Sequence, residues 1–164
     1  MRTLYNSILG DMESTLETGD NILIREQVID FLKSNYNYID SPKYNINKWI
    51  ISEKPNKKGL FEVCSKSSLG ILLLNFNIDS LTNGLFEFTE CESFICAGAK
   101  YLKSLEGSPR IVKETFNCSN CNSLKTLKDC PKESKTFFCQ NCGKKFTIAD
   151  VTKLCKVDTS RIKI

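Results

Sequence analysis

Four cysteines near the C-terminus have the spacing of a metal site. Cys118 and Cys121 form one Cys-x-x-Cys pair, Cys139 and Cys142 form a second, and the segment 122–138 separates the pairs. This spacing is typical of four-cysteine zinc ribbons, in which each pair lies on a tight turn, and Gly143 fits such a turn. Four thiolates would fill the coordination sphere, so the zinc would be structural and not catalytic.

A repeat that includes these cysteines predicts a different role. The segments 94–99, 116–121 and 137–142 align with one another, and each has a Phe two positions before a Cys. Ala99 stands where the later segments have their second cysteine. A zinc site does not explain a unit that lacks a ligand, whereas burial does, since a free cysteine behaves as a small hydrophobe. We expect core packing, with one structural zinc or a redox dithiol as the alternatives.

The nearly constant period predicts a stacked solenoid, in which no single unit can bury its own apolar face. Within each unit the Phe and the Cys point to the same side of a strand, and a Leu-x-x-Leu pair returns beneath it. The leucines and a closing proline recur in the first two units, as Leu102, Leu105 and Pro109 and then as Leu124, Leu127 and Pro131. A degenerate earlier rung is predicted over Leu72, Asn75, Ile78 and Leu81, which align with Cys96, Ala99, Leu102 and Leu105.

The flanking segments predict helices and a hairpin. An apolar residue recurs every four positions over 4–16, which favours a helix, and a second helix is expected over about 22–35. The apolar segments 46–52 and 60–64 flank a turn-forming Lys-Pro-Asn-Lys-Lys-Gly sequence, which predicts a β-hairpin. The sequence 147–150 has the form of a capping box that opens a short helix.

These elements together predict an α+β protein. N-terminal helices and a β-hairpin are expected to cap a short leucine-rich-repeat-like β-solenoid, and a C-terminal capping helix is expected to close it. The expected boundaries are 1–40 for the helical segment, 41–69 for the β-hairpin, 70–146 for the repeats and 147–164 for the C-terminal cap.

The units, together with the segments 4–9, 51–59 and 81–86, carry a family resemblance. Each unit is similar to a leucine-rich repeat, in which strand residues precede an Asn or Cys at the turn and then spaced leucines. The chain resembles short leucine-rich-repeat-like proteins of phage and bacterial origin with cysteine-bearing repeats of about 22 residues. This resemblance covers most of the chain and implies a non-enzymatic protein, without naming a ligand. Ala99 and the missing leucines of the last unit depart from the pattern.

Composition and charge indicate a soluble globular chain. Apolar residues make up 41% and charged residues 26% of the sequence, and no apolar run approaches membrane-spanning length. The net charge of +4 arises from interspersed charges and is a weak indication of nucleic-acid binding. A basic edge is interpreted as solvated; it consists of Lys125, Lys128, Lys132 and Lys135.

The cysteine and histidine content limits the cellular compartment and the kinds of catalysis that we expect. Nine cysteines without an export signal indicate reduced thiols in the cytoplasm, which would be a host cytoplasm or a virion if the chain is of phage origin. The absence of histidine excludes Ser-His and Cys-His nucleophilic catalysis. No glycine-rich phosphate loop or Gly-x-Ser-x-Gly motif occurs, so we expect no enzymatic activity and no cofactor.

The expected function is that of a non-catalytic repeat protein, either in protein–protein interaction or as a virion-associated accessory. Its partner would bind the outward face of the strands and turns, because solenoids bind ligands on such continuous faces. The alternative is a zinc-ribbon protein that binds nucleic acid or the transcription machinery through the four-cysteine module. The candidate binding face consists of Asn117, Ser119, Asn120, Phe138, Gln140 and Asn141.

Overall fold

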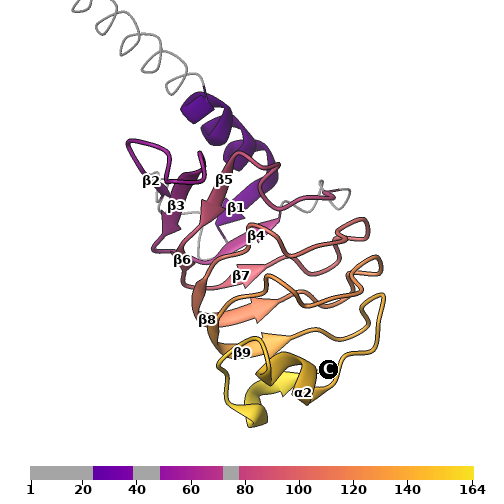
Figure 1. Cartoon of the computed structure of the whole chain (residues 1–164). Coiled ribbons are helices and arrows are strands. Elements are labelled where there is room, and N and C mark those ends of the chain that lie inside the picture. Colours follow the sequence, from indigo (N-terminus) through magenta and orange to yellow (C-terminus); the bar gives the residue numbers. More distant parts are fainter. Residues whose placement is uncertain (1–23, 39–48, 72–77) are drawn as a thin grey trace, which may run out of the picture.

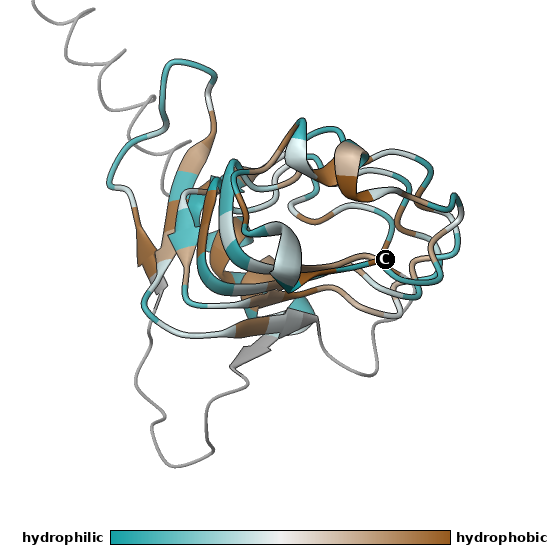
Figure 2. Cartoon of the chain, turned by 90° about the horizontal axis from the view of Figure 1, so that it is seen from below, coloured by the Kyte–Doolittle hydropathy of each residue, from teal (hydrophilic) through white to brown (hydrophobic). Residues whose placement is uncertain are grey.

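The computed structural model describes residues 24–38, 49–71 and 78–164. In this part the chain winds into a β-solenoid, as the repeat predicts, and successive coils follow the same path when seen from below (Figures 1 and 2). Residues 24–35 are helical and lie at the N-terminal end of the stack. The helix predicted over 4–16 lies outside the described residues.

One row of parallel strands carries the repeated Phe and Cys. Phe94, Phe116 and Phe137 are register partners on neighbouring strands, so the three units stack as predicted. At the N-terminal end β1 (Tyr36–Tyr38) pairs antiparallel with the first strand of this row. In spatial order the parallel strands are β4 (Leu69–Ile71), β7 (Phe94–Ile95), β8 (Ile111–Asn117), β9 (Glu133–Phe138) and β10 (Ile162–Lys163).

A second row of parallel strands, which the sequence did not predict, precedes the first row in each coil. β3 (Phe61–Ser65) pairs with β5 (Phe86–Phe88), and β6 (Glu90–Cys91) pairs with the first half of β8. A register irregularity between Val112 and Thr115 divides β8 between the two rows. Each coil therefore contributes strand segments to both rows before an irregular return segment, and in the coil that contains β7 the second row is divided between β5 and β6.

The hairpin and the stack share a strand. β2 (Trp49–Ile51) pairs antiparallel with β3, and the intervening turn contains Gly59 at a φ of 76°. Since β3 also pairs in parallel with β5, the coil stack begins within the segment assigned to the hairpin from the sequence. The predicted hairpin is therefore present, and its second strand is also part of the stack.

The earliest rung is displaced from its predicted register by one position. Leu69 of β4 is the register partner of Phe94, whereas the predicted alignment placed Gly70 there. Ile78 and Leu81, predicted for the return of this rung, are buried. Leu72 and Asn75 lie outside the described residues.

Aromatic rings form a continuous column through the core. Phe94 stacks on Phe116 with centroids 6.1 Å apart and planes 8° from parallel, and the Phe116 centroid lies 5.0 Å from that of Phe137. The column continues towards the N-terminal end through Phe88, 5.4 Å from Phe94, and Tyr36, 5.4 Å from Phe88. At most 4% of each of these five residues is exposed, so the stacking of rungs is what removes the rings from water.

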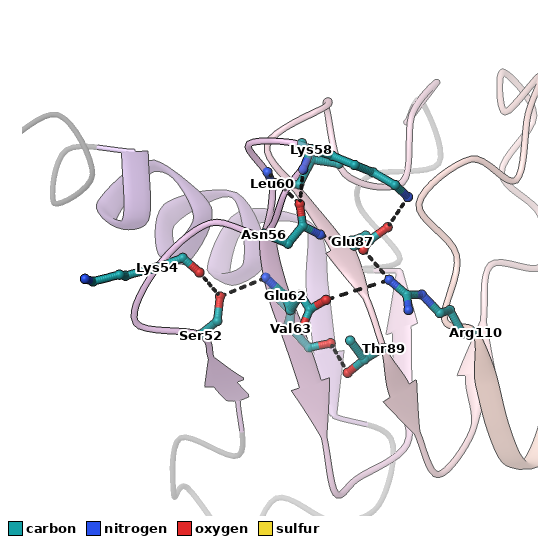
Figure 3. A network of polar contacts seen from close by, with 10 residues as sticks. All are labelled: Ser52, Lys54, Asn56, Lys58, Leu60, Glu62, Val63, Glu87, Thr89 and Arg110. Atoms are coloured by element: carbon teal, nitrogen blue, oxygen red, sulfur yellow. Dashed lines mark hydrogen bonds and ion pairs between the residues drawn. The ribbon is translucent and has the colours of Figure 1, made fainter. Parts of the chain in front are cut away.

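Outside the core, ion pairs connect successive rungs of the strand rows. Figure 3 shows the first of them. The Glu87 carboxylate forms an ion pair with the Lys58 ammonium at 3.3 Å and a second ion pair with the Arg110 guanidinium from the next coil. Each such exposed pair contributes only about 0.2–1 kcal/mol, but opposite charges in register disfavour a slipped pairing. The later pairs are Lys113–Glu90 at 3.2 Å, Lys135–Glu114 at 2.6 Å and Lys156–Glu133 at 3.6 Å.

A short helix and a last strand cover the C-terminal end. The Thr147 hydroxyl accepts from the Asp150 amide, and the Asp150 carboxylate accepts from the Thr147 amide, which together form a capping box at α2 (Ile148–Thr152). The 3-10 helix η2 (Thr159–Arg161) then leads into β10. α2 replaces the leucine ladder of the earlier units, and the buried residue that it contributes is Val151.

The aromatic column predicts where the fold is most sensitive. We expect Phe116→Ala to lower the free energy of unfolding by about 3–5 kcal/mol, because it opens a cavity between two rings. The matched variant Phe138→Ala, on the outward side of β9, should cost less than about 2 kcal/mol, since that ring is only half-buried. Urea unfolding monitored by circular dichroism measures both, and equal losses would contradict a core built on the column.

Candidate functional site

The repeat places its cysteines in two columns, the first of which lies in the core. Cys96, Cys118 and Cys139 each follow one of the stacked phenylalanines, and at most 2% of each cysteine is exposed. Ladder hydrogen bonds hold this column in register: the Cys96 amide donates to the Asn117 carbonyl at 2.8 Å, and the Cys118 amide to the Phe138 carbonyl at 2.9 Å. The inward thiols therefore pack as part of the apolar interior.

The second column lies at the following turn and consists of Ala99, Cys121 and Cys142. The Cys121 thiol donates to the Cys96 carbonyl oxygen at 3.2 Å, and the Cys142 thiol donates to the Cys118 carbonyl oxygen at 3.2 Å. Each turn cysteine thus satisfies a backbone acceptor of the preceding rung. Ala99 fits the column by size but has no side-chain donor.

These contacts do not gather the four candidate zinc ligands around one point. Within residues 24–38, 49–71 and 78–164, no group of three or more Cys, His, Asp or Glu side chains could hold a metal ion. The presence of glycine at position 143 has a steric explanation, because a Cβ there would lie 2.2 Å from the Asn122 carbonyl oxygen. The close approach of two neighbouring turns therefore accounts for this glycine without a metal.

The turn thiols ionise more readily than the inward thiols. The Cys118 thiol beside Cys142 lowers the pKa of Cys142, against the effect of burial, and the Cys121 amide acts in the same direction. The Cys96 thiol likewise lowers the pKa of Cys121, but that residue is fully buried. Cys64 is the other incompletely buried cysteine, and burial raises its pKa. Cys142 therefore combines access to solvent with a lowered pKa.

The predicted binding residues lie side by side on the outside of two adjacent rungs. Asn117 and Phe138 are half-buried register partners on β8 and β9, and the Lys163 ammonium lies 5.8 Å from the centroid of the Phe138 ring. The Asn117 side-chain oxygen accepts from the Ser119 amide at 2.9 Å, and the Ser119 hydroxyl accepts from the Gln140 amide at 3.2 Å. Through this last hydrogen bond Ser119 connects the two rungs. Its side chain is buried, so it is not available to a partner.

Two asparagines complete this group at the turn. Asn120 and Asn141 have φ values of 60° and 52°, in the left-handed region that Gly98 occupies with 81° in the earlier unit. Asparagine tolerates this conformation better than most residues. The Asn141 side-chain amide donates to the Asn120 side-chain oxygen at 3.2 Å, and both residues are exposed. The turn geometry thus leaves one exposed side-chain amide on each of these two rungs.

The lysines of the predicted basic edge divide between two surfaces. Lys135 forms an ion pair with a glutamate on β8. Lys125 and Lys128 instead lie on a return segment, where they line a hollow of about 260 Å³ together with Lys144 and Lys153. The sequence did not connect these four residues, because α2 interrupts the repeat between Lys144 and Lys153 and removes the periodic signal.

The thiol geometry predicts an order of alkylation. With iodoacetamide at neutral pH, we expect Cys142 to be modified before Cys64 and well before the buried cysteines, because the thiolate is the reacting species. Cys118→Ala should slow the reaction at Cys142, since it removes the thiol that lowers its pKa. Peptide mapping by mass spectrometry gives the order, and unfolded protein serves as the control in which all sites react. Protection of Cys142 that only a chelator removes would favour the zinc ribbon.

Among the described residues, no helix has the length and apolar character needed to cross a bilayer. No family model, curated protein or solved structure matches this chain. Its function is therefore inferred from its own geometry.

Proposed function

We propose that this chain is a non-catalytic repeat protein that binds another protein through the amide strip, the surface formed by Asn117, Asn120, Phe138, Gln140 and Asn141. The observation that carries the proposal is the continuity of this uncharged surface across two rungs whose strands are in register. A virion-associated accessory role is one form of the same proposal.

The composition of the amide strip suits a protein interface. The cores of interfaces are depleted of charged residues and enriched in aromatic residues. Phe138 supplies a half-buried ring, whereas the strand positions on the other side of it carry charges that are paired across rungs, as in Lys135–Glu114. A partner that covers the strip would therefore desolvate amides, one ring and the Lys163 ammonium beside that ring, without breaking an ion pair of the described residues.

The strip is also held rigidly. The Asn120 amide donates to the Gln140 carbonyl at 2.8 Å, next to the ladder hydrogen bond from Cys118 to Phe138. Because the backbone of both rungs is fixed in this way, a partner would order side chains and not loops. Binding then costs less conformational entropy than it would on a flexible surface.

The free thiols support a reducing location as part of this proposal. All nine cysteines are unpaired in the structure, and none of the nine is fully exposed. Buried reduced thiols that pack as small hydrophobes suit the cytoplasm, where disulfides are rare.

Site-specific photocrosslinking tests the amide strip. A photoreactive side chain at Gln140 should give a discrete protein adduct in extract of the source cells, whereas the same group at Glu53, which is also exposed but lies between β2 and β3, should not. Phe138→Asp in the Gln140 variant should abolish the adduct while the circular dichroism spectrum is unchanged. Identical adducts from both positions, or an adduct that survives Phe138→Asp, would contradict the proposal.

A further inference from the structure

A second surface of the solenoid carries the excess positive charge of the chain. The return segments 97–109, 119–131 and 140–154 contain seven lysines and three acidic residues. Their excess of four positive charges equals the net charge of +4 of the whole chain. All seven of these lysines are exposed, and we call the surface that they form the return face.

Charge is arranged differently on the return face and on the strand rows. On the strands, lysines meet glutamates of the adjacent rung, as in Lys113–Glu90. None of the return-face lysines belongs to an ion pair formed among the described residues. Lys103 and Lys125 even occupy equivalent positions of neighbouring units, each directly after the first leucine of its unit. No carboxylate in the described part of the chain lies within ion-pair distance of either lysine.

The return face is hollowed where the last coil meets the one before it. Lys125, Lys128, Lys144 and Lys153 surround a cavity of about 260 Å³. Its lining also includes Phe146, which is buried apart from 3% of its surface and has the Lys144 ammonium 5.8 Å from its ring centroid. The Phe146 ring therefore gives the hollow an apolar wall beside the Lys144 ammonium.

The single carboxylate that lines the hollow, that of Asp150, is hydrogen-bonded within the capping box of α2. Asp150 accepts hydrogen bonds from the Thr147 amide and from the Thr147 hydroxyl, each at 2.9 Å. These bonds lower the pKa of the Asp150 carboxyl, so it remains charged as part of the capping box. One carboxylate among four lysines leaves an excess of three positive charges around the cavity.

We propose that this hollow binds phosphate groups, as presented by a nucleic-acid backbone or by a free oligophosphate. Ammonium groups bind phosphate oxygens as point charges and need no fixed bidentate geometry. The remaining lysines of the return face extend the same charge along neighbouring rungs, which suits a ligand with several phosphates. The inference is independent of the amide strip, because it concerns different side chains.

Fluorescence anisotropy with the full chain and a labelled single-stranded oligothymidylate tests the hollow, with inorganic tripolyphosphate as competitor. We expect Lys125→Gln/Lys144→Gln to weaken binding by about fivefold per lysine at about 0.1 M salt and to reduce the slope of log K against log salt by about 0.7 per lysine. Lys57→Gln/Lys66→Gln removes the same charge from exposed lysines outside the return face and should leave binding unchanged.

The outcomes separate the two phosphate sources. Tight oligonucleotide binding with weak competition by tripolyphosphate supports a nucleic-acid backbone, whereas tripolyphosphate binding alone supports a free oligophosphate. The proposal is overturned if neither probe binds, if the control variant weakens binding as much as the hollow variant, or if polyglutamate competes as well as tripolyphosphate. Phe138→Asp alters the amide strip and should leave phosphate binding intact, so failure of one proposal remains distinct from failure of the other.

Discussion

The in-register stacking of inward residues between parallel strands is the constraint on which the rest of the molecule depends. A single coil is too thin to enclose its own phenylalanine and cysteine, and each becomes buried only because the next coil covers it. The rings of Phe94, Phe116 and Phe137 stack for this reason, and the turn cysteines reach the carbonyls of the preceding rung for the same reason. Register, once fixed by the core, also sets which outer residues become neighbours.

The sequence reveals the solenoid because one row of strands repeats the same residue types. The second row escapes prediction because its equivalent inward positions hold Cys91, Val112 and Ser134, which share burial but no residue type. The first rung is misplaced by one position for a related reason. Its strand has Leu69 and Gly70 at the positions of Phe94 and Ile95, so the strand lacks the Phe that marks the other units. The alignment of this rung then depends on the apolar residues of its return segment. Because return segments vary in length, that alignment is wrong by one position.

The cysteine spacing shows why a motif can be read in two ways. Phe116 and Phe137, which precede the two cysteine pairs, are register partners, so the pairs lie one rung of the stack apart. Any solenoid of this period with Cys-x-x-Cys in consecutive units therefore reproduces the spacing of a zinc ribbon. Spacing alone cannot separate the two arrangements, since they differ in whether the second cysteine of each pair faces a metal or the carbonyl of the neighbouring rung. In this structure it faces the carbonyl.

The surfaces of the solenoid differ in charge because they differ in backbone order. Along the strands, ladder hydrogen bonds place side chains of successive rungs opposite one another, so opposite charges can pair and an uncharged strip can run without interruption. Past the turns, the leucine-bearing stretches 102–105 and 124–127 are not joined to each other by backbone hydrogen bonds in the described part of the chain, and α2 reshapes the last return, so the lysines there are placed by the packing of leucines beneath. Charge that is neither paired nor needed for register is then free to serve a ligand. The strip and the hollow are made of different side chains, so the two proposals rest on separate parts of the charge pattern.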